Sequence, residues 1–174
     1  MTVLELGKVQ DKQAPILRGQ EVVATLRASN WKESATLTCD DTEWVLRSAK
    51  GGRLIGALSS DPEISDTGEQ ARFLAEQASM WRGTWDLTLE GVRYTMGPKS
   101  MWRGTYRVER SGQEVAVSGT TGGWSLRVTL EAAADVPLTH QLFLLWMAFL
   151  LNRRASSAAT GAAVAGGAAA ASGS

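Results

Sequence analysis

A run of ten consecutive apolar residues, 142–151, constrains the fold of this chain more than any other feature. The run leaves no polar stripe at any helical angle, and a helix that is apolar on all sides has to be enclosed by protein or by lipid. Pro137 suits the first turn of such a helix, and Arg153 and Arg154 suit the dipole at its C-terminal end. We therefore expect a helix over about 137–153.

The length of this helix distinguishes protein from lipid as its surroundings. An apolar helix over residues 136–151 would be about 24 Å long, whereas the hydrocarbon core of a bilayer is about 30 Å thick. Burial in protein is therefore the prediction. A membrane anchor formed by residues 142–151 is the alternative.

Most of the chain before this helix alternates apolar and polar residues with a period of two. In the run 81–90, for example, Trp85, Leu87 and Leu89 share one parity, while Asp86 and Thr88 share the other. Only a pleated strand places two such sets on opposite faces. Turn sequences separate the runs, which predicts a series of antiparallel strands. We expect strands over residues 4–9, 22–28, 35–39, 44–48, 53–58, 69–78, 81–90, 92–96, 102–109, 113–119 and 124–130.

A sheet with one apolar face can enclose an apolar helix by curling around it. The predicted fold class is therefore mainly β, with an antiparallel, closed or nearly closed barrel of about 10–12 strands around a central C-terminal hydrophobic α-helix. Closure would also remove exposed strand edges. We expect this barrel domain to span residues 1–154 and the Ala/Gly/Ser-rich residues 155–174 to form a disordered tail.

A six-residue sequence, Ser-Met-Trp-Arg-Gly-Thr, occurs twice, at 79–84 and at 100–105. We expect both copies to open strands, with Trp81 and Trp102 as core anchors and the neighbouring arginines on the outer face. The alternative is that the two tryptophans stack on a ligand.

The succession of Trp- and Arg-rich strands, followed by the helix sequence from Pro137 through Trp146, resembles the tubby C-terminal-like superfamily. This superfamily includes the tubby domain, the phospholipid scramblases and the LURP-one-related proteins, and the chain is similar to a small bacterial-type member. The resemblance implies a twelve-stranded barrel around a central hydrophobic helix. It also implies contact with membrane phospholipid through basic side chains on the outside of the barrel.

The basic side chains that the resemblance points to lie on the polar face of the predicted strands. The candidates for contact with lipid or a partner are Arg82, Arg93, Arg103, Arg107 and Arg127. Acidic residues such as Asp86 and Glu109 are interleaved with them, and the whole chain balances 18 Lys and Arg against 18 Asp and Glu. This balance predicts weak attraction to an anionic membrane and argues against a nucleic-acid partner.

The residues that enzymes use for nucleophilic or metal chemistry are scarce. Cys39 and His140 are the only cysteine and histidine, so neither a disulfide nor a structural zinc site can form. A Cys39–His140 dyad would be the one available nucleophile–base pair, and Asp40-Asp41 would suit a hairpin turn better than a cation site. We expect no catalytic residue, no metal site and no cofactor.

These observations favour a non-enzymatic binding or scaffold module of the tubby-like barrel class that contacts membrane phospholipid or a protein partner. Two alternatives remain: a tail-anchored or peripheral membrane protein that uses the helix 142–151, and a carrier of a small apolar ligand. The N-terminal residues have no secretory pattern, and we expect a cytoplasmic protein without an integral membrane span.

Overall fold

A computed structural model describes residues 1–28, 33–62, 65, 67–100, 103–122 and 127–169. Within these residues, twelve strands are joined by connections that are short except for the one over residues 59–72. One 3₁₀ turn, η1 (Lys50–Gly52), lies between the fifth and sixth strands, and one helix, α1 (Leu138–Ala169), follows the last strand. The strands are β1 (Thr2–Leu6), β2 (Gln13–Arg18), β3 (Glu21–Ala28), β4 (Ser34–Cys39), β5 (Thr42–Ser48), β6 (Leu54–Leu58), β7 (Phe73–Ser79), β8 (Thr84–Leu89), β9 (Val92–Ser100), β10 (Thr105–Arg110), β11 (Gln113–Thr121) and β12 (Arg127–Ala132).

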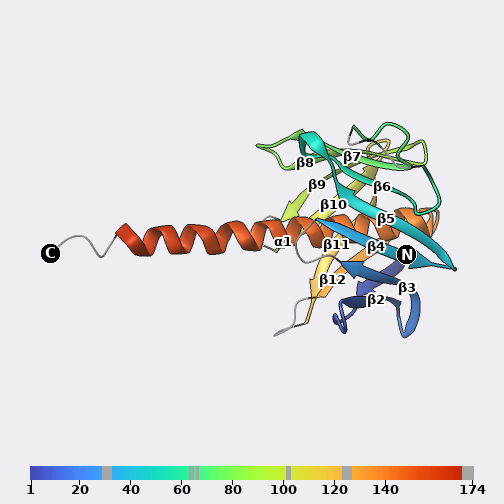
Figure 1. The fold of residues 1–174 in the computed structure, drawn as a ribbon, viewed down its shortest axis with the longest axis horizontal. Helices are drawn as coiled ribbons and strands as arrows, with labels where there is room; N and C mark the ends of the chain where they lie inside the picture. Colours follow the sequence, from blue (N-terminus) through green and yellow to red (C-terminus); the bar gives the residue numbers. More distant parts are fainter. Residues whose placement is uncertain (29–32, 63–64, 66, 101–102, 123–126, 170–174) are drawn as a thin grey trace.

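The strands form a closed antiparallel barrel. Each strand pairs with the next one along the chain (Figure 1). Strand β1 also pairs with β12, which completes the ring. At this closure Thr2 lies opposite Ala132 and Leu4 lies opposite Leu130. The predicted fold class is confirmed, with twelve strands.

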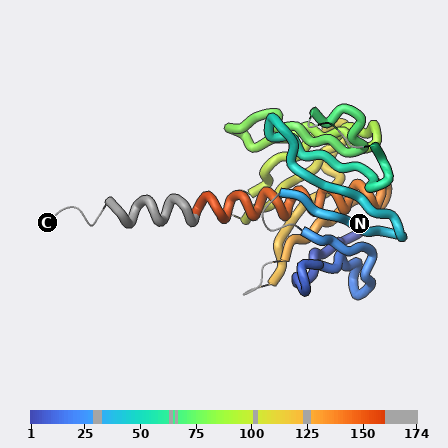
Figure 2. Tube along the Cα trace, viewed as in Figure 1, coloured from blue at the N-terminus to red at the C-terminus, as the bar shows by residue number. Residues whose placement is uncertain are grey.

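The first half of α1 occupies the interior of the barrel (Figure 2). Between Leu142 and Ala148 no side chain is more than 2% exposed, and this includes Trp146. Burial on every side explains why the run needs no polar stripe, because the inward residues of the strands surround it. The helix is therefore enclosed by protein, as predicted from its length.

An aromatic column links the strands to the helix. The rings of Trp44 and Phe73 are stacked with centroids 4.5 Å apart, and Phe73 lies 5.2 Å from Phe143 on α1. Phe143 in turn lies 5.6 Å from Trp146. Large inward side chains from β5 and β7 thus fill the space that the helix leaves.

One strand, β2, was missed in the sequence. Pro15 interrupts it, and a proline removes a donor from a strand ladder. The outward-facing positions of this strand also carry the apolar Pro15 and Leu17, both half-buried, so the sequence does not alternate between apolar and polar residues. The structure places the Pro15 carbonyl as acceptor for the Gly7 N–H at 2.7 Å, so the strand still pairs through its available groups.

The prediction that Trp81 is a core anchor is wrong. Strand β8 begins at Thr84, and the side chain of Trp81 is 99% exposed in the connection before it. The physical reason is Gly83, whose φ of 61° places it in a turn rather than in a strand. The alternation of β8 therefore begins only after Gly83, with Trp85 as its first buried residue. Trp102, its counterpart in the second copy, lies outside the described residues.

Helix α1 continues to Ala169, past the end expected near residue 153, and so includes part of the segment 155–174 for which disorder was expected. Alanine has the highest helix propensity, and extending an existing helix avoids the cost of nucleation. Within the described part of the chain, no helix combines the length and the apolar character needed to cross a membrane.

Candidate functional site

Connections between strands lie alternately at the two ends of the barrel, because each strand runs antiparallel to the next. The connections β1–β2, β3–β4, β5–β6, β7–β8, β9–β10 and β11–β12 share the end from which α1 leaves, which we name the exit end. The other connections, including β12–α1, share the opposite end, which we name the start end. Contacts of α1 agree with this division: His140 meets Glu90 between β8 and β9, and Arg154 meets Glu33 between β3 and β4.

Charge is segregated between these two ends. Among the described residues, the exit end carries eight basic side chains against two acidic ones, whereas the start end carries six acidic side chains against one basic one. At the exit end these are Lys8, Lys12, Lys50, Arg53, Arg82, Arg103, Arg153 and Arg154 with Asp11 and Glu33, and at the start end Asp40, Asp41, Asp61, Glu69, Glu90 and Asp135 with Arg72. The strands between the ends carry eight of each sign. The zero net charge therefore conceals a strong polarity along the barrel axis.

The structure separates the five candidate arginines into two groups. Arg82 and Arg103 are exposed side chains in the β7–β8 and β9–β10 connections, both at the exit end. Arg93, Arg107 and Arg127 lie on strands of the outer wall. The sequence set is thus not one site, and only its first two members belong to the basic end.

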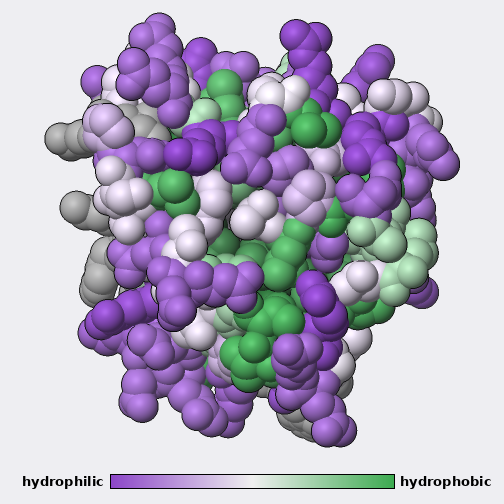
Figure 3. Space-filling view, turned by 90° about the vertical axis from the view of Figure 1, so that its right-hand side faces the viewer, coloured by the Kyte–Doolittle hydropathy of each residue, from purple (hydrophilic) through white to green (hydrophobic). Residues whose placement is uncertain are grey.

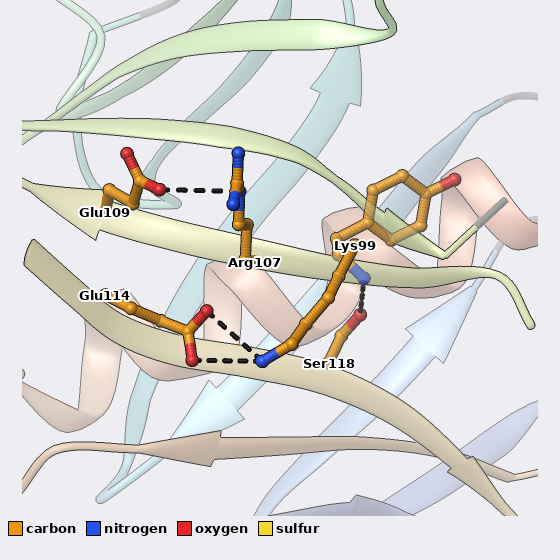
Figure 4. A network of polar contacts seen from close by, with 6 residues as sticks. Lys99, Arg107, Glu109, Glu114 and Ser118 are labelled. Atoms are coloured by element: carbon orange, nitrogen blue, oxygen red, sulfur yellow. Dashed lines mark hydrogen bonds and ion pairs between the residues drawn. The ribbon is translucent and has the colours of Figure 1, made fainter. Parts of the chain in front are cut away.

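The arginines of the wall lie among acidic side chains. Arg107 pairs with Glu109 at 3.4 Å, and in the same region of the wall Lys99 pairs with Glu114 at 3.1 Å (Figure 4). Arg127 pairs with Glu5 at 2.7 Å. Arg93 lines an outer groove of about 510 Å³ together with acidic residues from β8 and β10. Because each positive charge has a close negative neighbour, this face offers little net attraction to an anion.

Among the described residues of the exit end, those of the β7–β8 turn form the most exposed apolar feature. Met80 and Trp81 are 82% and 99% exposed, and Arg82 follows them directly. The turn is held by two hydrogen bonds of its own: the Arg82 N–H donates to the Ser79 side-chain hydroxyl at 3.2 Å, and the Gly83 N–H donates to the Met80 carbonyl at 3.4 Å. An exposed indole beside a guanidinium thus stands on a defined turn.

The next turn of the exit end, β9–β10, contains Arg103 and Gly104 of the second sequence copy. Gly104 has a φ of 58°, and a Cβ there would overlap the carboxamide of Asn152 on α1. A slot of about 260 Å³ lies between these two turns and the helix, with apolar lining from Trp85, Tyr106 and Leu151. The two copies therefore form neighbouring turns on one side of the helix exit.

The departing helix is tied to this end by an ion pair. Arg154 Nε donates to Glu33 Oε1 at 2.7 Å, and Arg154 Nη2 donates to the Ser48 hydroxyl at 3.1 Å. Hydrogen bonding to Arg154 lowers the pKa of Glu33 to about 2. Arg154 therefore serves the fold, whereas Arg82 and Arg103 extend from the turns into solvent.

At the start end, the only histidine is part of the packing. His140 is 1% exposed, its Nδ1 lies 3.0 Å from the Tyr94 hydroxyl, and its Nε2 lies 3.2 Å from Glu90 Oε2. Burial holds the pKa of His140 below its ordinary value, although the hydrogen bond to Glu90 acts in the opposite direction. These contacts orient the start of α1.

Cys39 does not share this histidine's hydrogen bonds. Its thiol is buried and interacts with the neighbouring Asp40 carboxylate at 3.8 Å, and burial raises its pKa. Asp40 and Asp41 have positive φ angles in the β4–β5 turn, as expected for a hairpin. Among the described residues, no group of three His, Cys, Asp or Glu side chains could hold a metal ion.

The sequence analysis missed the basic exit end, although the sequence contains the charge pattern that reveals it. Counting charges by strand face gave a balanced surface, but counting them by alternate connections separates Lys and Arg from Asp and Glu. Figure 3 looks onto the start end, where hydrophilic side chains surround apolar ones near the middle.

Comparison of the chain with protein-family models, with curated proteins and with solved structures found no match.

Proposed function

We propose that this chain is a non-enzymatic binding module of the tubby-like barrel class, and that it docks with its exit end on the anionic phospholipid surface of a membrane. The observation that carries the proposal is the excess of six basic side chains among the described residues of that end.

The polarity of the barrel favours one orientation on such a surface. A basic side chain near an anionic leaflet contributes about 1 kcal/mol, and this contribution falls off within about 10 Å at moderate salt. The exit end therefore gains attraction, while the acidic start end is repelled and faces away. The balanced wall contributes little in either direction, which disfavours docking on its side.

The cytoplasmic leaflet, which is the leaflet rich in anionic lipid, is the surface we propose, in keeping with the cytoplasmic location expected from the sequence. A protein partner with an acidic face is the second candidate for the same end. We do not retain the alternative of an anchor at residues 142–151, because these residues are packed inside the barrel. The carrier alternative is also disfavoured, because α1 fills the interior.

Binding of the full chain to vesicles tests the proposal. We expect binding to phosphatidylcholine vesicles that contain phosphatidylserine, weak binding without phosphatidylserine, and a steep loss with salt. The double variant Arg82→Glu/Arg103→Glu should bind at least about tenfold more weakly, since it reverses two charges at the docking end. The matched control, Arg93→Glu/Arg107→Glu, makes the same change in net charge on the wall.

Equal losses in the two double variants would show that total charge matters and that the exit end does not. Failure of the unaltered chain to bind anionic vesicles at low ionic strength would refute the membrane proposal. Binding to an acidic protein under the same conditions would then favour the second candidate.

A further inference from the structure

We infer that Met80 and Trp81, at the tip of the β7–β8 turn, insert into the interfacial region of the bilayer on which the exit end docks. This inference rests on the proposed function and adds an apolar component to it.

The exposure of these two side chains calls for an explanation outside the fold. Trp44, Trp85 and Trp146 are at most 4% exposed, whereas Trp81 is 99% exposed and Met80, its neighbour, is 82% exposed. Burying a large apolar side chain is worth about 1.5–3 kcal/mol, and the folded chain leaves this gain unused at the tip. Trp81 and Met80 thus form an exposed apolar surface at one tip, which is available for contact with another molecule.

The chemistry of the tip matches a membrane interface. Tryptophan has an apolar ring with one polar N–H, and such rings collect at the level of the lipid headgroups. Arg82 follows Trp81 directly, so its guanidinium can remain beside the phosphates while the two preceding side chains enter the apolar layer. The backbone N–H of Arg82 donates to the Ser79 hydroxyl, and this hydrogen bond holds the backbone of the turn that carries the three side chains.

A second apolar tip lies across the exit end. In the β1–β2 connection Val9 is 58% exposed and follows Lys8, so an apolar side chain again stands beside a cation. Along the closed ring of twelve strands, the β1–β2 and β7–β8 connections are six strands apart, which is halfway around the barrel. Two opposed contacts would hold the barrel axis along the membrane normal.

A continuous apolar layer is a better partner for these tips than a nucleic acid. Stacking on a base would use the indole of Trp81 alone. Met80 and Val9 are not aromatic, lie at opposite sides of the exit end, and gain from contact only with a surface that is apolar over the whole width between them. Among anionic partners, a lipid bilayer supplies that surface.

The extension of α1 leaves through the same end and has to turn aside. A straight helix from Arg154 to Ala169 would reach about 22 Å beyond the ion pair with Glu33. Docking of the full chain therefore requires a bend after Arg154, and the side chains of residues 155–159 are exposed, so little packing is lost. A chain that ends at Arg154 should bind at least as tightly.

Depth-dependent fluorescence quenching tests the insertion directly. The full chain is mixed with phosphatidylcholine–phosphatidylserine vesicles that carry bromine on the upper part of the acyl chains. We expect quenching of the tryptophan emission, and we expect this quenching to be clearly weaker in Trp81→Tyr. The buried Trp44, Trp85 and Trp146 lie inside the barrel and should contribute nothing to this difference.

A second measurement separates the apolar contact from the charge. Met80→Ser/Trp81→Ser should weaken vesicle binding about tenfold or more, and the loss should persist at high salt. The control, Val22→Ser/Val45→Ser, removes two exposed apolar side chains from the wall and should leave binding unchanged. Arg82→Glu/Arg103→Glu should instead act on the salt-dependent part.

The outcomes distinguish the two proposals. Vesicle binding that is unaffected by Met80→Ser/Trp81→Ser, with equal quenching in the unaltered chain and Trp81→Tyr, would overturn the insertion and leave electrostatic docking intact. Loss of binding in the chain that ends at Arg154 would also overturn it, because the extension would then be the contact. No vesicle binding at all, or quenching of Trp81 by an oligonucleotide instead, would refute both.

Discussion

The two ends of the barrel use their polar side chains in different ways. At the start end, His140 is enclosed between Tyr94 and Glu90, and the carboxamide of Gln141 donates to the Val136 carbonyl at 2.7 Å. At the exit end, Met80, Trp81 and Arg82 extend into solvent from a turn. The start end therefore fixes the helix in the barrel, while the exit end presents side chains that the fold itself does not need.

This difference shows where stability and binding are separated in the molecule. Residues that position α1 cannot be changed without affecting the core, because the interior is packed around the helix. The exposed side chains at the tip of the β7–β8 turn, Met80, Trp81 and Arg82, can be changed with little effect on folding, since they lie outside that core. Three changes, from the largest expected effect to the smallest, test this separation.

Removing a tryptophan from the packed helix and removing one from an exit turn should change stability by very different amounts. Trp146→Ala empties a site that is 2% exposed and should lower the free energy of unfolding by about 3–5 kcal/mol. Trp81→Ala removes a side chain that is 99% exposed and should change it by less than about 0.5 kcal/mol. Chemical denaturation measures both. A large loss in Trp81→Ala would show that the turn supports the fold.

The start end should make folding sensitive to mild acid. Burial lowers the pKa of His140 in the folded chain, so below its ordinary pKa of about 6.5 the unfolded chain binds a proton that the folded chain does not. The contribution of His140 to stability is thus complete above about pH 6.5 and is lost as the pH falls towards the lowered folded value. Denaturation at a series of pH values measures the loss.

The substitution His140→Gln removes this titration and should flatten the pH dependence below about pH 6.5. Tyr94→Phe is the control for the hydrogen bond: it should cost about 1–2 kcal/mol at neutral pH and keep the dependence. If His140→Gln retained the full slope, other groups would be responsible for it.

The sequence predicted the barrel and the helix inside it, but it did not predict the basic exit end. The apolar run 142–151 and the two-residue alternation were sufficient to predict a closed barrel around a helix, because this arrangement buries the helix on all sides and the apolar face of every strand. Strand β2 escaped because Pro15 and Leu17 are apolar residues at outward-facing positions, which hides the alternation in the sequence, and pairing with β1 and β3 outweighs that local irregularity.

The candidate site was harder to predict than the fold. Arg82 and Arg103 were identified, but so were Arg93, Arg107 and Arg127, because all five share the polar parity. What separates them is topology: a turn residue and a wall residue have the same parity, and only the pairing of all twelve strands assigns each connection to an end. Trp81 was misplaced for the same reason, since a run that alternates across Gly83 does not reveal that the strand begins at Thr84.

The smallest effect on stability should come from the extension of α1. A chain that ends at Arg154 keeps the ion pair with Glu33 and the packed residues up to Leu151. It loses residues 155–174, of which residues 155–159 have exposed side chains. Its melting temperature should therefore stay close to that of the full chain, as expected from the predicted domain 1–154. The control is a chain that ends at Leu151, which also loses Arg154 and should melt at a lower temperature. A clear drop for the chain that ends at Arg154 would mean that the extension stabilises the exit end, and the separation of folding from binding at that end would no longer hold.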